Sequence, residues 1–262
     1  MTSATTPASY TESLFSLEGQ LAVVTGASQG IGLAITQALA SAGADIVAVS
    51  RDMPEGDSNA RTLVQALGRK FTPLAADLSR HEQVIELAGD LAGRGVDILI
   101  NNAGAIRRAP ATEHSDEDFD YVLDVNLRST FILSREVGAS MVRRGRGKIV
   151  NTASLLSFQG GVNVAGYACS KSAVAALTKA LANEWAPMGV NVNAVAPGYV
   201  ATANTADLRQ DAERSQQILD RIPAGRWAQS SDVAGAVLFL CSRAADYVHG
   251  ITLPVDGGWL AR

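Results

Sequence analysis

Cysteine, histidine and long apolar runs are scarce in this sequence. Of 262 residues only 2 are Cys and 3 are His, and Cys169 and Cys241 stand far apart without a Cys-x-x-Cys pair. This spacing speaks against a disulfide scaffold and against a metal site. No apolar run approaches the roughly 18 residues that cross a bilayer, so we expect no membrane span.

Charge of one sign is also lacking. The chain has 22 Lys and Arg against 26 Asp and Glu, a formal net charge of -4. This balance provides no basic surface for nucleic acid or for an anionic membrane. Residues 1–16 are rich in Thr, Ser and Ala and lack the basic and apolar segments of a secretory signal. We therefore expect a cytoplasmic protein with a flexible arm at 1–16 and one domain at 17–262.

Seven short apolar runs alternate with stretches of helical spacing. The runs are almost continuously apolar, as in strands buried on both faces of a parallel sheet. We therefore expect a doubly wound α/β fold with a seven-stranded parallel sheet flanked by helices in a single domain. The predicted strands are Leu21–Thr25, Ile46–Ser50, Phe71–Ala75, Ile98–Asn101, Lys148–Thr152, Val190–Val195 and Ile251–Val255.

The segment from Ala201 to Pro223 is polar and contains no strand pattern. Folds of this class often carry a helical lid over the substrate at such a place, which is the interpretation we favour for residues 201–223. The alternative is a surface insertion without a role in binding.

The first predicted strand runs into a glycine-rich turn, Thr25–Gly32, with the sequence TGASQGIG. A chain that must turn sharply and come close to a pyrophosphate needs glycine, and the phosphates then lie at the N-terminus of the next helix. The position between strand and helix favours dinucleotide binding over a purely structural turn.

The second predicted strand ends at Ser50-Arg51, where an NAD site usually has an acidic residue for the ribose hydroxyls. A hydroxyl followed by a guanidinium is better suited to the 2′-phosphate of NADP. The alternative is that Arg51 is a solvated loop residue beside Asp52.

Tyr167 and Lys171 share one helix face because they lie four residues apart. A tyrosine with an ordinary pKa near 10 is a poor base at neutral pH, and a nearby ammonium favours its phenolate form. Ser154 and the segment Asn101–Gly104 follow two further predicted strands, on the edge where parallel sheets bind ligands. Together these residues predict an acid/base site in which Ser154 holds a substrate oxygen.

The motifs together resemble the short-chain dehydrogenase/reductase family over about residues 17–262. The resemblance implies a Rossmann-type fold, hydride transfer between NAD(P)(H) and a secondary alcohol or ketone, and usually a homotetramer. It is carried by Thr25–Gly32, Asp77-Leu78, Asn101–Gly104, Asn126, Ser154, Tyr167, Lys171 and Pro197-Gly198.

The resemblance also implies roles for single residues. Tyr167 would be the proton donor or acceptor and Ser154 would orient the substrate oxygen. Lys171 would lower the pKa of the tyrosine and bind the nicotinamide ribose, and Asn126 would hold a water that relays protons from Lys171. The implied cofactor contacts are Gly26, Ser28, Gln29, Gly30, Ile31 and Gly32 at the pyrophosphate, Ser50, Arg51, Asp77 and Leu78 at the adenosine, and Asn102, Ala103, Gly104, Pro197, Gly198, Val200 and Thr202 at the nicotinamide.

A narrower resemblance links the chain to 2-deoxy-D-gluconate 3-dehydrogenases, also described as 2-dehydro-3-deoxy-D-gluconate 5-dehydrogenases. It is carried by segments such as Gly104–Arg108, Ser157–Gly161, Ile218–Trp227 and Val255–Arg262. This group mostly uses NAD, whereas Ser50-Arg51 favours NADP. Either the cofactor preference or the substrate has therefore shifted.

A sugar acid offers a carboxylate and several hydroxyls to its site. Arg107 or Arg108, directly after the Asn101–Gly104 segment, could clamp the carboxylate, and Gln159 and Asn163 could bind hydroxyls. The alternative is that both arginines are solvated or lie in an oligomer contact. Two other functions stay open: a 3-oxoacyl or general ketone reductase of the same family, and a non-catalytic NAD(P)-sensing protein.

Overall fold

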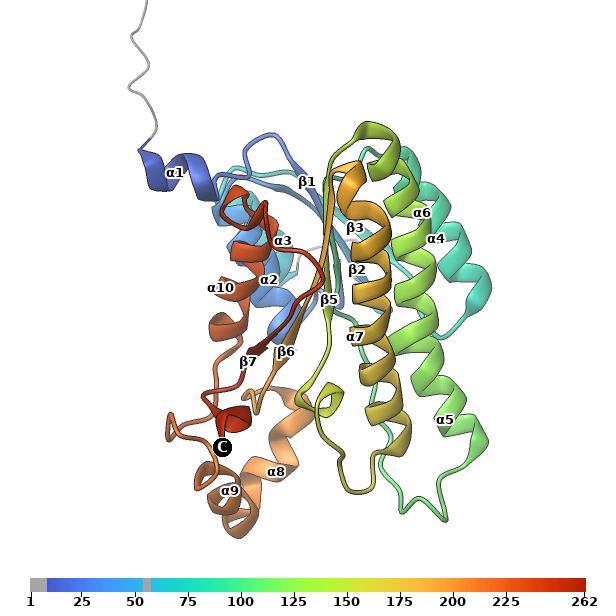
Figure 1. Cartoon of the computed structure of the whole chain (residues 1–262), viewed down its shortest axis with the longest axis vertical. Coiled ribbons are helices and arrows are strands. Elements are labelled where there is room, and N and C mark those ends of the chain that lie inside the picture. The colour runs from blue at the N-terminus through green and yellow to red at the C-terminus, as the bar shows by residue number, and fades with distance from the viewer. Residues whose placement is uncertain (1–8, 54–57) are drawn as a thin grey trace, which may run out of the picture.

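The computed structural model describes residues 9–53 and 58–262, and it is built around one parallel sheet (Figure 1). The sheet has seven strands in the order β3-β2-β1-β4-β5-β6-β7. The predicted seven-stranded parallel fold in a single domain is thereby confirmed. The strands are β1 (Leu21–Thr25), β2 (Asp45–Ser50), β3 (Phe71–Ala75), β4 (Ile98–Asn101), β5 (Gly147–Thr152), β6 (Val190–Pro197) and β7 (Thr252–Val255).

Helices cover both faces of the sheet. One face packs against α2 and α10 with α3 beside them, and the other packs against α4, α6 and α7 (Figure 1). The α-helices in the described residues are α1 (Tyr10–Phe15), α2 (Gly30–Ser41), α3 (Asn59–Ala66), α4 (His81–Gly93), α5 (Asp116–Leu123), α6 (Ser129–Arg144), α7 (Ala165–Trp185), α8 (Ala206–Gln210), α9 (Ala212–Leu219) and α10 (Ser230–Cys241).

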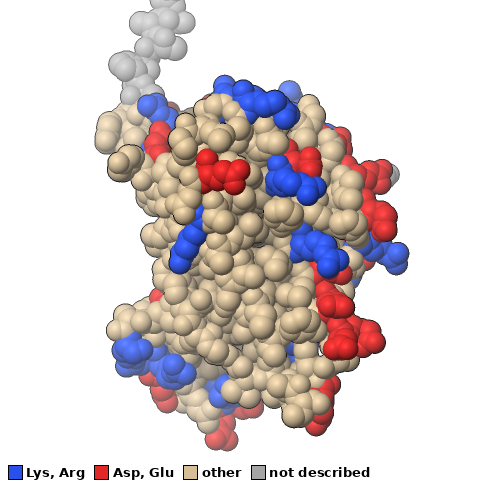
Figure 2. Space-filling view, turned by 45° about the vertical axis from the view of Figure 1, so that its right-hand side comes forward, with Lys and Arg blue, Asp and Glu red and all other residues tan. Residues whose placement is uncertain are grey.

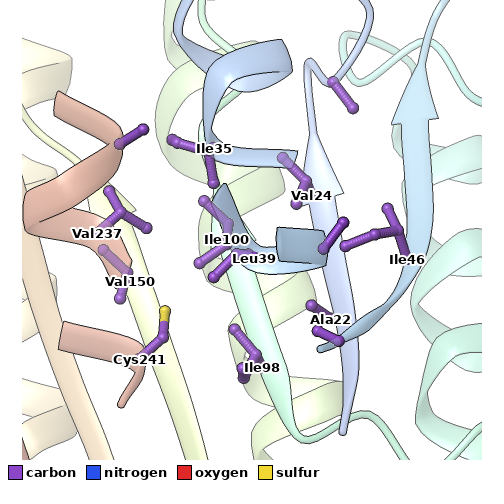
Figure 3. Close-up of a cluster of buried hydrophobic side chains, with 14 of the residues drawn as sticks. Ala22, Val24, Ile35, Leu39, Ile46, Ile98, Ile100, Val150, Val237 and Cys241 are labelled. Carbon is purple, nitrogen blue, oxygen red and sulfur yellow. The ribbon is translucent and has the colours of Figure 1, made fainter. Parts of the chain in front are cut away.

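The apolar strand runs explain the two layers. In β1 and β2 every residue after the first is buried, so these strands can exist only between two covered faces. Figure 3 shows how one face is filled: Ile35 and Leu39 of α2 and Val237 and Cys241 of α10 lie over strand side chains such as Ile98. At about 25 cal/mol per Å² of apolar surface buried, such clusters supply the main force that holds helices to the sheet.

Smaller elements lie at the N-terminus and between β6 and α10. Of the predicted arm at 1–16, residues 1–8 lie outside the described residues, whereas α1 begins after a Ser9 cap whose side chain accepts from Glu12 N. Residues 201–223 form the short 3-10 helix η4 (Ala203–Thr205), α8 and α9. No helix among the described residues is long and apolar enough to cross a membrane.

Candidate active site

The strand order places a cleft at the middle of the sheet. After β3 the chain crosses back to pair β4 with the free side of β1, so the loops beyond these two strands diverge at their carboxyl ends. Ligands of open parallel sheets bind at such a reversal of strand order. The glycine turn and the Asn101–Gly104 segment leave the sheet at this point, as predicted from the sequence.

The glycine turn is packed too closely for side chains. A Cβ on Gly32 would lie 2.0 Å from the carbonyl oxygen of Gly26, and Gly30 has a left-handed φ of +55°. Helix α2 begins with Gln29 as its N-cap, which makes no side-chain cap hydrogen bond. Its first backbone N–H groups are therefore free of a side-chain cap and can bind an anion such as a pyrophosphate.

Thr25 joins the two loops of the cleft. Its hydroxyl accepts hydrogen bonds from the backbone N–H of Asn102 at 2.9 Å and of Ala103 at 3.0 Å. The side chain of Asn102 in turn donates to the carbonyl of Thr25 at 2.9 Å. These bonds hold the Asn101–Gly104 segment against the glycine turn, so both predicted cofactor segments belong to one surface. Across the cleft, a Cβ on Gly30 would lie 3.5 Å from the methyl group of Thr202.

The end of β2 carries a buried hydroxyl and an exposed cation. Ser50 is 9% exposed and its Oγ has no hydrogen-bond partner among the described residues. The side chain of Arg51 is 62% exposed and lies 3.3 Å from Asp52. The orphaned hydroxyl and the guanidinium fit a phosphate at this strand end, because a phosphate accepts hydrogen bonds from both.

Asp77 and Leu78 follow β3 beside this strand end. Burial opposes the charged form of Asp77, but hydrogen bonds from the hydroxyl and backbone N–H of Ser79, together with Arg51 and Arg80, lower its pKa below the usual value. Leu78 is buried against the α4 side of the sheet. An ionised Asp77 and an apolar Leu78 can flank an adenine, as the sequence predicts.

Tyr167 and Ser154 meet above the carboxyl end of β5. Burial raises the pKa of Tyr167 above its ordinary value, while the hydrogen bond with Ser154 and the positive charge of Arg108 lower it. Ser154 also accepts from the backbone N–H of Leu156 at 3.2 Å, which fixes its hydroxyl at the start of a tight turn. The tyrosine hydroxyl is therefore protonated at neutral pH and can donate a proton to an oxygen held by Ser154.

Lys171 lies one helical turn after Tyr167 and is 3% exposed. Its Nζ donates to the carbonyl of Thr152 at 2.6 Å and lies 5.7 Å from the centre of the Tyr167 ring. Burial lowers the pKa of Lys171 to about 8. Arg108 is a second cation that lowers the pKa of Tyr167, and the roles of Lys171 toward this tyrosine and toward the nicotinamide ribose stay predictions.

Asn126 is buried in the π-helical turn η1 (Asp124–Arg128) between α5 and α6. Its Oδ1 accepts from the backbone N–H of Ala105 at 2.7 Å, and its Nδ2 donates to the carbonyl of Ala105 and to Ser170. The side chain therefore joins α7 to the loop after Gly104. A π-turn inside helical structure is a common feature of functional sites.

The two adjacent arginines of that loop have different surroundings. The Nε of Arg107 donates to Asp118 at 3.0 Å, and its guanidinium carbon lies 4.4 Å from the centre of the Tyr121 ring. Arg108 is exposed, makes no ion pair with a described residue, and acts electrostatically on Tyr167. Arg108 is thus an exposed cation whose charge reaches Tyr167, whereas Arg107 is held by Asp118 and Tyr121 of α5.

Gln159 and Asn163 lie in the loop between Ser154 and Tyr167. The Oε1 of Gln159 accepts from the indole N–H of Trp259 at 3.2 Å. Asn163 has a left-handed φ of +61°, and its carbonyl accepts from the backbone N–H of Ala109 at 3.0 Å. Asn163 therefore fixes the loop that carries the two arginines, a contact that no motif in the sequence indicates.

The segment after β6 passes from the cleft into residues 201–223. Gly198 allows a close contact, because a Cβ there would lie 2.7 Å from the Cα of Asp256. Val200 forms a bridge with Ala228, and Thr205 donates to the carbonyl of Val200. Of these predicted contacts, Thr202 faces the glycine turn across the cleft, while the nicotinamide contacts of Pro197, Gly198 and Val200 stay predictions.

A separate cavity of about 280 Å³ opens between the end of β7 and the start of α10. Tyr199, Asp256 and the ion pair of Arg226 with Asp232 at 2.7 Å line it. None of its lining residues belongs to the predicted catalytic set. We therefore place the reactive centre at Tyr167 and not in this cavity.

Comparison with known proteins places these observations in a family. Residues 26–260 match the family model described as enoyl-(acyl carrier protein) reductase. A 2-dehydro-3-deoxy-D-gluconate 5-dehydrogenase from Bacillus subtilis (strain 168) is 52% identical over 254 residues, which cover 97% of this chain and 99% of the relative.

Two crystal structures, both with bound NADP, are similar throughout. One, of a proposed 2-deoxy-D-gluconate 3-dehydrogenase from Agrobacterium tumefaciens, is 51% identical, with a TM-score of 0.90 over 95% of this chain and 99% of that chain. The other, of a proposed NAD(P)-dependent gluconate 5-dehydrogenase from Beutenbergia cavernae, is 53% identical, with a TM-score of 0.91 over the same shares. The resemblance predicted from the motifs is thus confirmed, and the chain belongs to the short-chain dehydrogenase/reductase family of NAD(P)-dependent oxidoreductases.

Proposed function

We propose that this enzyme transfers hydride between NADP and the secondary alcohol of a deoxy sugar acid, either 2-dehydro-3-deoxy-D-gluconate or 2-deoxy-D-gluconate. The observation that carries the proposal is Arg108, an exposed guanidinium without an ion-pair partner among the described residues, whose positive charge lowers the pKa of the Tyr167 hydroxyl. A carboxylate is the natural partner of such a guanidinium, which can bind it through two parallel hydrogen bonds. The names of the relatives, which act on sugar acids, support the same substrate class.

Proton transfer is assigned to Tyr167, with Ser154 holding the substrate oxygen. The raised pKa keeps the tyrosine protonated at neutral pH, so it donates to a ketone oxygen and receives the proton of an alcohol in the reverse direction. The nicotinamide, when bound, supplies or accepts the hydride. Arg108 stabilises the tyrosine in its ionised form, because it is the positive charge that lowers the pKa of this hydroxyl.

Lys171 and Asn126 are assigned supporting roles beside Tyr167 and Ser154. Lys171, with a pKa of about 8, can hold or release a proton close to physiological pH, which suits a group that binds ribose hydroxyls and exchanges protons beneath Tyr167. Asn126 keeps Ala105 and Ser170 in place, and a Cβ added to Gly104 would lie 3.4 Å from its Oδ1 and 3.6 Å from the Lys171 ammonium. We expect any proton relay to pass through this small cluster.

The cofactor is assigned to the glycine turn, the Asn102–Gly104 segment and the ends of β2 and β3. Ser50 and Arg51 would hold the 2′-phosphate of NADP, since one offers an orphaned hydroxyl and the other an exposed guanidinium. The narrower resemblance implies a preference for NAD. The end of β2, however, lacks the acidic residue that an NAD site needs there. The two NADP-bound relatives support the same preference.

We further propose a cytoplasmic homotetramer in which residues 201–223 form a lid. Figure 2 shows a broad area without charged side chains in the middle and lower part of the face that it presents. Phe131 on α6 and Ile85 on α4 are 41% and 49% exposed and provide further apolar area. Uncharged surface of this extent is typical of a face that another copy covers. Analytical ultracentrifugation measures the assembly directly.

The test of the substrate class uses the two neighbouring arginines as a matched pair. Arg108→Ala should lower kcat/KM for the sugar acid by about 10- to 100-fold, as expected for a lost hydrogen bond to a charged group, and should lower that for a neutral ketone far less, because the ketone loses only the effect of Arg108 on the Tyr167 pKa. Arg107→Ala removes the same charge from the same loop but breaks contacts with Asp118 and Tyr121. Equal effects of the two variants, or equal effects on acid and ketone, would contradict the proposal and favour a general ketone reductase.

A further inference from the structure

Trp259, three residues before the end of the chain, is held between two parts of the substrate region. It is 4% exposed. Its ring centre lies 4.8 Å from that of Tyr199, and the guanidinium carbon of Arg221 lies 3.9 Å from the ring. It packs in one apolar cluster with Leu155 of the Ser154 turn and with Ile218 of α9. The indole is therefore fixed at the junction of the lid segment, the Ser154 turn and the C-terminus.

The only polar group of this ring points to the Ser154 turn. Its N–H donates to the Oε1 of Gln159 at 3.2 Å, across 100 positions of sequence. An indole nitrogen is a donor and never an acceptor, so it can bind only the carbonyl end of the Gln159 amide. The backbone of Gln159 is also fixed, because its N–H donates to the carbonyl of Leu155 at 3.1 Å.

The other end of the amide is left without a partner among the described residues. The Nε2 of Gln159 makes no hydrogen bond to them, although its side chain is half-buried and begins five residues after Ser154. An amide that rotates freely presents either a donor or an acceptor to a ligand. With its carbonyl accepting from Trp259, the Gln159 amide is held in one orientation, and its two N–H donors are left for a ligand.

We infer that Trp259 is a positioning residue for substrate specificity: it fixes the Gln159 amide so that the site donates hydrogen bonds to an acceptor oxygen of the substrate. The inference rests on the proposed sugar-acid function, whose carboxylate and keto oxygens are acceptors of this kind. Arg108 then supplies the charge, and Gln159, five residues after Ser154, supplies a neutral donor. Trp259 thus acts on the substrate through Gln159 and not by direct contact.

The test is a double-mutant cycle on Trp259→Phe and Gln159→Leu in the full-length enzyme. Phe keeps an aromatic ring near Tyr199 and Arg221 and removes the N–H together with part of the indole ring, a loss of volume that the Trp227→Phe control shares. Trp259→Phe should raise KM for 2-dehydro-3-deoxy-D-gluconate by about threefold to tenfold, with kcat and the KM for NADP unchanged within about twofold. In the Gln159→Leu background the same change should have no further effect, because the group through which it acts is gone.

Trp227→Phe is the matched control. Trp227 lies in the same aromatic group, with its ring centre 5.5 Å from that of Tyr199, but its N–H donates to Ser215 of α9. Its replacement should leave the substrate KM unchanged within about twofold. A second variant, Gln159→Glu, keeps an acceptor for Trp259 and replaces the free donor by a carboxylate oxygen, so it should raise KM for the acid more than for a neutral ketone.

Additive effects of Trp259→Phe and Gln159→Leu would overturn the inference, as would parallel changes in kcat and in the KM for NADP. An unchanged KM in Gln159→Glu would overturn it independently of how Trp259→Phe folds. Turnover of the acid by the wild-type enzyme is measured first. An inactive wild type overturns the proposed function and this inference with it, whereas an active wild type with additive variants overturns the inference alone.

Discussion

Replacing Lys171 by Met should change how the stability of the protein depends on pH. Lys171 is buried, and burial lowers its pKa from 10.5 to about 8. Below pH 8 the folded protein therefore keeps a poorly solvated ammonium. Between about pH 8 and 10.5 the folded state has released this proton and the unfolded state has not, so the free energy of unfolding rises with pH in this window.

The size of the effect follows from the pKa difference. At about 1.4 kcal/mol for each pKa unit, the shift of Lys171 corresponds to a pH-dependent contribution on the order of 3 kcal/mol. Met lacks this titration. It also leaves the Thr152 carbonyl without its bond from Nζ, at a cost of about 1–3 kcal/mol that does not vary with pH. The variant should therefore differ from the wild type by a constant offset below pH 8 and by a growing difference above it.

The measurement is the thermal midpoint of wild type and Lys171→Met at pH 7 and pH 10, followed by circular dichroism without cofactor. For a chain of this size about 1 kcal/mol shifts Tm by roughly 2–4 °C, so the wild type should gain roughly 5–10 °C on the variant. Lys179→Met, an exposed lysine on the same helix, is the control and should show the wild-type profile. Parallel pH profiles for wild type and Lys171→Met would refute the claim that the buried Lys171 ammonium destabilises the folded state.

Three further variants test other parts of the site. Tyr167→Phe should lower kcat by about 10²-fold or more while the Kd for NADPH, measured by fluorescence, stays unchanged, since only the proton path is lost; near-normal turnover would refute the assignment. Arg51→Ala should raise KM for NADPH by about 10- to 100-fold and leave KM for NADH almost unchanged. An equal effect on both cofactors would contradict the assignment of Arg51 to the 2′-phosphate. Gly32→Ala places a Cβ 2.0 Å from the Gly26 carbonyl, so NADPH binding by calorimetry should weaken by at least about tenfold, and unaltered binding would contradict the packed turn.

The fold was predictable because local pattern decides it. Strands buried on both faces must be apolar at nearly every position, and the boundaries of β1, β3 and β4 agree with the runs Leu21–Thr25, Phe71–Ala75 and Ile98–Asn101. The pairing of Tyr167 with Lys171 on one helix is equally local, since a spacing of four fixes the shared face.

The surroundings of each site residue were not predictable, because they depend on partners distant in sequence. Arg107 and Arg108 are adjacent and identical in type, so the sequence does not distinguish them. Only in the fold do Asp118 and Tyr121 bind the Arg107 guanidinium and leave that of Arg108 exposed. The direction of the Lys171 ammonium likewise depends on a carbonyl at the end of β5.

Trp259 illustrates the same limit. From the sequence, the Asp256–Trp259 segment is typical of a turn or an assembly element. Its contact with Gln159 arises only when the C-terminus folds onto the Ser154 turn. Hydrogen bonds of this range have no signature in the spacing of residues.

The most direct test of the account is the reduction of NADP and of NAD, side by side, with 2-dehydro-3-deoxy-D-gluconate and 2-deoxy-D-gluconate as substrates, followed by absorbance at 340 nm. We predict turnover of at least one of the two acids, with a kcat/KM for NADP at least about tenfold above that for NAD, because Ser50 and Arg51 offer partners to a 2′-phosphate. Absence of turnover with both acids and both cofactors would contradict the sugar-acid assignment. Turnover with NAD preferred over NADP would contradict the role given to Ser50 and Arg51.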